Sequence, residues 1–193
     1  MIILNASGKD LEKAAGMILE GKIIAYPATG VYGFTCNALE MKAVERIIEI
    51  KGRDSAKKFI IMANKDNAGK YGKINPVAGK IIKKYWPGLV SIIVEKKKTI
   101  PDYITKDKVC LSALNNITEF LTRKLELPLI TTSANFSGEE ACKNKEEIEE
   151  KFSDLIDGMI VQEEKLRGKP STIVDTTTTP YAIVRQGYVE VKV

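Results

Sequence analysis

The sequence predicts one α/β domain whose sheet is mixed rather than wholly parallel. Strand-like and helix-like segments alternate along all 193 residues, and this alternation is typical of helices that pack on a sheet. No repeat, low-complexity linker or shift in composition divides the chain. A hairpin-length gap between residues 26 and 31 and a cluster of strands after residue 159 indicate antiparallel pairing beside the parallel pairing. We therefore expect residues 1–193 to form a single domain.

The expected strands are short apolar runs bounded by turn residues. Apolar and β-branched side chains favour the extended conformation, whereas glycine and proline interrupt it. The runs that meet this description are residues 23–26, 31–36, 59–62, 89–94, 109–111, 129–132, 159–161, 172–174 and 182–184. We expect these runs to supply the sheet.

The expected helices have apolar residues at helical spacing and recognisable ends. Ser7 and Asp10 have the S-x-x-D form of a capping box, and the helix that follows ends at Gly21. Asn75-Pro76 has the form of a helix start, because proline is favoured at the first helical position. The helical segments are residues 11–19, 43–51, 76–86, 117–125 and 145–152.

The chain contains no histidine, and this excludes several kinds of catalytic site within it. Ser-His-Asp and Cys-His catalysis, HExxH metal sites and histidine proton shuttles all need that side chain. Any chemistry must therefore use Lys, Arg, Ser, Thr, Asn or carboxylates. The formal net charge of +5 favours anionic partners, either phosphorylated small molecules or nucleic acid.

Cysteine usage and hydropathy favour a cytoplasmic protein. Cys36, Cys110 and Cys142 lie far apart without a C-x-x-C pair, which suggests neither disulfides nor a cysteine zinc site. No apolar run reaches the roughly 18 residues that cross a bilayer, and the segment MIILNASGKD lacks the features of a signal peptide. We expect a cytoplasmic location and no membrane partner.

Two segments carry residues suited to charged ligands. Lys51-Gly52-Arg53, with Lys57 and Lys58, places four cations after a helix. A polyphosphate suits such a cluster, and a solvated basic loop fits the same pattern. Residues 131–138 bring hydroxyl and amide groups after an apolar strand. This segment is either a ligand site at the carboxyl end of a strand or a polar turn.

Five ordered motifs resemble those of the YrdC-like family of threonylcarbamoyl-AMP synthases (L-threonylcarbamoyladenylate synthases). They are K-G-R from Lys51, W-P-G from Trp86, T-S-A-N-x-S-G from Thr132, P-S-T-I-V-D from Pro170 and V-R-x-G from Val184. The matching segments run from about residue 21 to residue 187. The resemblance implies a twisted, open α/β domain with a mixed sheet, flanking helices and a basic concave groove.

The resemblance also implies a function and its partners. It implies a nucleotidyltransferase that makes threonylcarbamoyl-AMP from L-threonine, bicarbonate and ATP, with release of pyrophosphate, for threonylcarbamoyladenosine modification of tRNA. Magnesium would arrive with ATP, and no protein metal ligand is implied. Further partners would be tRNA or double-stranded RNA and the downstream threonylcarbamoyl transferase machinery.

The matching motifs assign roles by resemblance to individual residues. No catalytic residue is implied beyond those that position the substrates. The residues implied for ATP binding are Lys51, Arg53, Asn135 and Arg185, and those implied for threonine binding are Thr29, Lys58, Ser133 and Ser171.

Two segments depart from the family pattern. Where the family has P-T-E-T-x-Y-G-L, residues 27–34 read P-A-T-G-V-Y-G-F; they lose two threonines and a carboxylate but keep Tyr32 and Gly33. Ser112 stands where the family has an arginine expected to clamp a substrate carboxylate. These departures leave open a divergent YrdC-like paralogue that binds nucleotide or RNA without this activity. Lysines between residues 70 and 98 would serve the RNA alternative, although a solvated lysine face explains them better, since acidic residues coexist on the surface helices.

Overall fold

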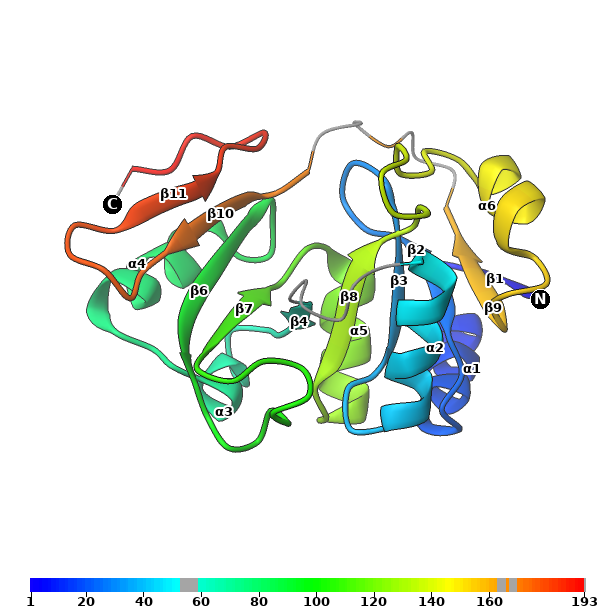
Figure 1. Cartoon of the computed structure of the whole chain (residues 1–193), viewed down its shortest axis with the longest axis horizontal. Helices are drawn as coiled ribbons and strands as arrows, with labels where there is room; N and C mark the ends of the chain where they lie inside the picture. The colour runs from blue at the N-terminus through cyan, green and yellow to red at the C-terminus, as the bar shows by residue number, and fades with distance from the viewer. Residues whose placement is uncertain (53–58, 163–165, 167–169, 193) are drawn as a thin grey trace.

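The structure is a computed structural model that describes residues 1–52, 59–162, 166 and 170–192 (Figure 1). Strands and helices alternate in these residues as the sequence predicts. The strands are β1 (Ile2–Asn5), β2 (Ile24–Pro27), β3 (Tyr32–Asn37), β4 (Ile60–Met62), β5 (Gly72–Lys73), β6 (Val90–Lys96), β7 (Lys108–Ser112), β8 (Leu129–Ser133), β9 (Gly158–Val161), β10 (Thr172–Asp175) and β11 (Ala182–Arg185). The helices are α1 (Gly8–Leu19), α2 (Met41–Lys51), α3 (Ala68–Tyr71), α4 (Pro76–Tyr85), α5 (Asn116–Leu125) and α6 (Lys145–Phe152).

A single mixed sheet joins the described strands. Its order is β1-β9-β2-β3-β8-β4-β7-β6-β10-β11, and β5 pairs with β6 beside this path. β2 and β3 form an antiparallel hairpin, whereas β4 is parallel to β7 and β6 is parallel to β10. The predictions of a mixed sheet and of a hairpin near residue 28 are confirmed.

β8 links the two halves of this sheet. It pairs antiparallel with β3 on one side and with β4 on the other. In this register Thr131 lies opposite Thr35 of β3 and Ile60 of β4. Because side chains alternate between the faces of a strand, Thr131 and Ser133 are directed to the same face of the sheet.

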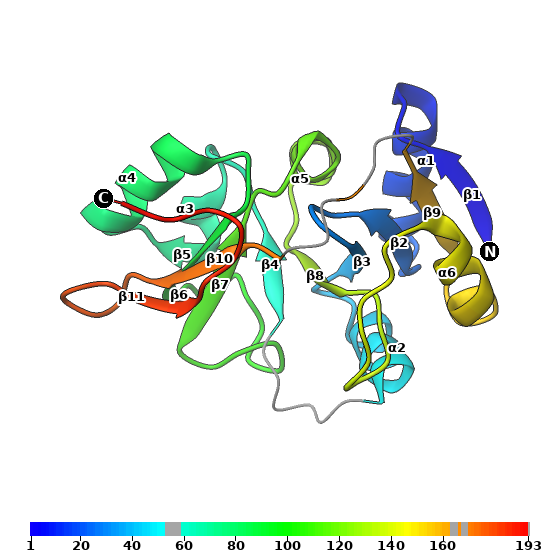
Figure 2. The ribbon, with the colours of Figure 1, turned by 90° about the horizontal axis from the view of Figure 1, so that it is seen from above.

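Helices cover the two faces of the sheet unequally (Figure 2). α1, α5 and α4 lie on one side, and α2 and α6 lie on the other side over the half that contains β3 and β9. Phe34 of β3 and Phe152 of α6 pack edge to face with ring centroids 5.0 Å apart. Within the described part of the chain, no helix covers the second side over β7, β6 and β10 (Figures 1 and 2).

Three short elements were not predicted, and one predicted cap is wrong. β1 is an edge strand in which Ile2 and Ile3 are exposed and Leu4 is buried, and α3 and β5 have only four and two residues. Such short elements depend on distant partners more than on local sequence. The α1 helix is present, but Ser7 makes no side-chain cap. The Asp10 carboxylate instead accepts a 2.7 Å hydrogen bond from the N–H of Asn5.

One carboxylate ties α2, β2 and the start of β9 together. Asp157 accepts from Nη1 and Nη2 of Arg46 at 2.8 and 3.2 Å. It also accepts from the buried N–H of Ile23 at 2.8 Å. The Asp157 side chain is only 25% exposed, so these bonds form in a partly desolvated place where charge-assisted pairs are strong.

We expect Asp157→Ala to lower the free energy of unfolding by about 1–3 kcal/mol, because a backbone N–H and a guanidinium lose their acceptor together. Glu20→Ala is the matched control, since it breaks the solvent-exposed pair between Glu20 and Lys22 and should leave stability nearly unchanged. Denaturant titration measures both variants. Equal stability of the two variants would contradict the role given to Asp157.

Candidate active site

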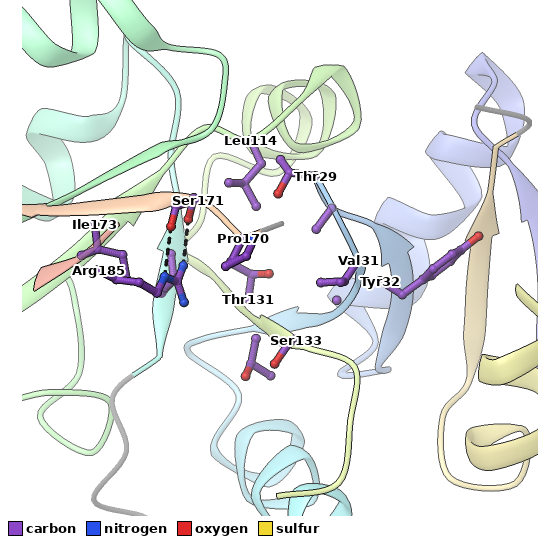
Figure 3. A pocket seen from close by; sticks show the side chains of 14 residues that line it. Thr29, Val31, Tyr32, Leu114, Thr131, Ser133, Pro170, Ser171, Ile173 and Arg185 are labelled. Carbon is purple, nitrogen blue, oxygen red and sulfur yellow. Dashed lines mark hydrogen bonds between the residues drawn. The ribbon is translucent and has the colours of Figure 1, made fainter. Parts of the chain in front are cut away.

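A cavity of about 270 Å³ lies in the middle of the sheet, beside β8 (Figure 3). Four residues assigned to substrates by the sequence motifs line it, and each comes from a different segment. Thr29 lies in the turn between β2 and β3, and Ser133 ends β8. Ser171 precedes β10, and Arg185 ends β11. Residues up to 156 positions apart in the sequence thus meet at one cavity, and their individual roles stay predictions.

The remaining assigned residues lie elsewhere. Lys51 and Asn135 are beside the cavity but do not line it. Arg53 and Lys58 lie outside the described residues, so their assignments also stay predictions.

Lys51 holds the segment that carries Ser133. Its ammonium donates to the carbonyl oxygens of Ser133 and Asn135 at 2.6 and 3.1 Å, and to Asn135 Oδ1 at 3.1 Å. The Ser133 hydroxyl donates to the same Oδ1 at 2.6 Å. Lys51 is 3% exposed, and a buried ammonium is stable only when its hydrogens have acceptors. Lys51 therefore fixes the backbone from residue 133 to residue 135.

A chain of hydroxyl groups leads from Arg185 into the sheet. Arg185 Nε donates to the carbonyl oxygen of Ser171 at 3.0 Å, and Nη2 donates to Ser171 Oγ at 3.1 Å (Figure 3). Ser171 Oγ lies 3.0 Å from Ser91 Oγ. Ser91 in turn donates to Ser112 Oγ at 2.9 Å. Ser112 is fully buried in this chain of contacts and does not line the cavity.

Arg185 places a positive charge on the cavity wall. Among the described lining residues it is the one charged side chain. Desolvation lowers the pKa of Arg185, but a guanidinium keeps its charge at neutral pH. The cavity thus combines a fixed cation with the hydroxyls of Thr29, Thr131, Ser133 and Ser171, a set suited to an anionic, hydrogen-bonding ligand.

Tyr32 and Gly33, which match the family pattern, line the cavity wall. Tyr32 points its ring away from Ser171 and Arg185 (Figure 3), and burial raises the pKa of Tyr32 to about 12, so the phenol is neutral at physiological pH. A Cβ on Gly33 would lie 3.1 Å from the carbonyl oxygen of Thr132. Gly33 therefore allows β3 to approach β8 closely.

Two residues near the site were not assigned from the sequence. Thr131 lines the cavity, and its hydroxyl lies 2.7 Å from the hydroxyl of Tyr26. The sequence signal that could have identified Thr131 is its position in the run of hydroxyl residues after Ile130. Ser91 has no such signal, because it is a single small residue within an otherwise apolar strand.

No group of three or more His, Cys, Asp or Glu residues that could hold a metal ion occurs in the described parts of the chain. None of the helices in those parts is long and apolar enough to cross a membrane.

A protein-family model named Sua5_yciO_yrdC, described as Telomere recombination, matches residues 16–187. The chain belongs to the Sua5/YciO/YrdC family. Two similar members of this family are archaeal. A putative threonylcarbamoyl-AMP synthase of Methanocaldococcus jannaschii is 35% identical to this chain, and the match covers 95% of this chain and 88% of that protein. A threonylcarbamoyl-AMP synthase of Pyrococcus abyssi is 32% identical over 90% of this chain.

Solved structures of the family agree with the predicted fold. The crystal structure of P. abyssi Sua5 complexed with L-threonine has a TM-score of 0.89 and 32% identity, and covers 97% of this chain. The crystal structure of Escherichia coli YciO has a TM-score of 0.87 at 24% identity, and this likeness concerns the fold alone. This chain spans 53% of the P. abyssi synthase sequence and 58% of that Sua5 chain. The α/β fold class and the YrdC-like resemblance are confirmed.

We expect Lys51→Met to lower the free energy of unfolding by roughly 2–3 kcal/mol, because the carbonyls of Ser133 and Asn135 lose a charged donor while the aliphatic stem is kept. Lys42→Met is the matched control, since Lys42 is exposed on the same helix. Denaturant titration gives the two stabilities, and hydrogen exchange reports on residues 133–135. Unchanged exchange in Lys51→Met would show that Lys51 does not hold this segment.

Proposed function

We propose that this protein makes threonylcarbamoyl-AMP from L-threonine, bicarbonate and ATP and releases pyrophosphate. One observation carries the proposal: Thr29, Ser133, Ser171 and Arg185, all assigned to substrates from the family motifs, line the same cavity. The names of the M. jannaschii and P. abyssi relatives and the L-threonine complex of P. abyssi Sua5 support the choice of substrate. The chain spans about half of the P. abyssi protein.

The site offers room for two substrates. The cavity of about 270 Å³ shares Ala28, Thr29 and Leu114 with a neighbouring cavity of about 810 Å³. Ligand sites typically enclose about 300–1,000 Å³. An amino acid can therefore occupy one part of the site while a larger substrate extends beyond it.

The chemistry requires alignment and charge stabilisation rather than a protein nucleophile. Bicarbonate gives carbon dioxide by loss of hydroxide, the threonine amine adds to the carbon dioxide to form a carbamate, and the proton that the amine releases combines with the hydroxide to give water. A carbamate oxygen then attacks the α-phosphorus of ATP, and the bond from that phosphorus to the oxygen that bridges it to the β-phosphorus breaks, releasing pyrophosphate. Hydroxyl groups such as those of Thr29 and Ser133 can hold threonine, and the guanidinium of Arg185 can stabilise negative charge. None of these roles requires a histidine, and the chain has none.

Magnesium would enter with ATP and neutralise part of the triphosphate charge. The described residues that line the cavity include hydroxyl groups but no carboxylate. Mg²⁺ at nucleotide sites is commonly held by substrate phosphates and waters with few protein ligands. The donor set fits a magnesium ion carried by the nucleotide.

The product would pass to a second reaction. Threonylcarbamoyl-AMP is a mixed anhydride that water cleaves, so we infer rapid transfer to tRNA by a threonylcarbamoyl transferase in the cytoplasm. Direct contact of this chain with tRNA or double-stranded RNA is part of the same proposal, which the positive net charge of +5 supports.

We expect pyrophosphate release only when ATP, magnesium, bicarbonate and L-threonine are all present. Replacing threonine by valine, which lacks the hydroxyl, should reduce kcat/KM by tenfold or more, since polar groups of the site would lose their partner. Continuous pyrophosphate detection with each amino acid in turn measures this. ATP binding without turnover of any amino acid would instead support the divergent-paralogue alternative.

Ser133→Ala should raise KM for threonine roughly fivefold to tenfold, as expected when one hydrogen bond worth about 1–1.5 kcal/mol is lost. Ser153→Ala is the control, because Ser153 follows α6 and does not line the cavity. Steady-state kinetics at saturating ATP give both values. A KM for Ser133→Ala that equals that of the control would remove Ser133 from the threonine site.

A further inference from the structure

Ser91 connects the interior of the sheet to the cavity wall. It lies on β6 and is fully buried, and its hydroxyl contacts both Ser112 and Ser171. A serine hydroxyl has one hydrogen to donate, and Ser91 gives it to Ser112. The hydrogen bond between Ser171 and Ser91 must then be donated by Ser171. A lone pair of Ser171 Oγ is therefore left to accept from Arg185 Nη2.

This arrangement gives the hydrogen bonds one direction, from Arg185 through Ser171 and Ser91 to Ser112. If Ser91 lost its hydroxyl, the Ser171 hydrogen would lose its acceptor and the Ser171 hydroxyl would no longer be held in one orientation. Its lone pair would then be less well aligned with Nη2 of Arg185. Hydrogen bonds in such a buried chain strengthen one another, so the loss of one link weakens its neighbours.

The orientation of the Arg185 side chain depends on these hydrogen bonds, because its strand does not bury it. β11 is an edge strand whose four residues are all exposed. Nε and Nη2 of Arg185 contact the backbone oxygen and the hydroxyl of Ser171 (Figure 3). Nη1 makes no hydrogen bond to any described residue. A guanidinium has five N–H donors, so those that Ser171 does not use are available to a ligand in the cavity.

Ser112 makes the chain of serines possible in this protein. Its side chain is fully buried and accepts from Ser91 at 2.9 Å. A guanidinium has donors but no acceptor, so an arginine at this position could not receive the hydrogen of Ser91. The serine at position 112 therefore fixes the direction of the chain and leaves Arg185 as the cation among the described residues of the cavity wall.

We propose that Ser91 is a positioning residue: it fixes the hydroxyl of Ser171 as an acceptor and thereby orients the free N–H groups of Arg185 toward an anionic group of the substrate. The identity of that substrate rests on the proposed function. The orientation of Arg185 does not, and it can be measured in the protein without ligand.

The first test compares the Nη–Hη NMR resonances of Arg185, which include the group that donates to Ser171 Oγ, in the wild-type protein and in Ser91→Ala, with Arg185→Lys to assign them. Hydrogen exchange at this group should be about tenfold faster in Ser91→Ala, and Ser91→Thr, which keeps the hydroxyl, should restore slow exchange. The resonance of Arg46, which Asp157 holds elsewhere, is the internal control for the fold. Unchanged exchange at Arg185 in Ser91→Ala would overturn the proposal.

The second test is a double-mutant cycle with steady-state kinetics. Ser91→Ala should raise KM for the substrate that Arg185 binds by roughly fivefold while changing kcat less, and the effect should vanish in the Arg185→Ala background. Separate titrations of threonine and ATP identify that substrate. An equal loss in both backgrounds would show a merely structural role and overturn the proposal.

The two tests separate this inference from the proposed function. A wild-type protein without activity, in which Arg185 still responds to Ser91→Ala, would support the positioning role and contradict the synthase proposal. If Ser91→Ala does not fold, Ser112→Ala tests the same chain from its far end. Faster exchange at Arg185 in that variant supports the proposal, and no change overturns it.

Discussion

The antiparallel pairing of β8 with both β3 and β4 is the constraint on which the site depends. This pairing joins two halves of the sheet and places Ser133 opposite Gly33 and Thr131 opposite Ile60. A slip of one residue would direct Thr131 and Ser133 to the opposite face. Gly33 permits the close approach that this register needs, because a side chain there would press on the β8 backbone. The hydroxyl side of the cavity is thus a consequence of strand pairing.

Lys51 and Arg185 have different roles in the structure, although the family motifs assigned both to ATP binding. Lys51 is buried and donates to acceptors within residues 133–135, so it stabilises the protein's own backbone. Arg185 is anchored by one residue, Ser171, and retains N–H groups that Ser171 does not use. Geometry therefore separates a cation that organises the site from a cation that can meet a ligand. An ATP contact by Lys51 stays a prediction.

Local signals predicted the elements well and the long-range contacts poorly. The predicted helix 145–152 has the same bounds as α6, and the hairpin near residue 28 followed from spacing alone. The meeting of Thr29, Ser133 and Arg185 was expected only through the family motifs, since no local pattern relates them. Ser91 could not be found, because its partner Ser171 lies 80 residues away. The edge strand β1 was missed for the same reason: its partner is β9.

The crystal structure of this protein with L-threonine and a non-hydrolysable ATP analogue tests the central claim most directly. We predict threonine in the cavity beside β8, with Thr29 and Ser133 within hydrogen-bond distance and the guanidinium of Arg185 in contact with an anionic group of one of the two ligands. Threonine bound at another place, or a cavity filled by water while the nucleotide is bound elsewhere on the surface, would contradict it.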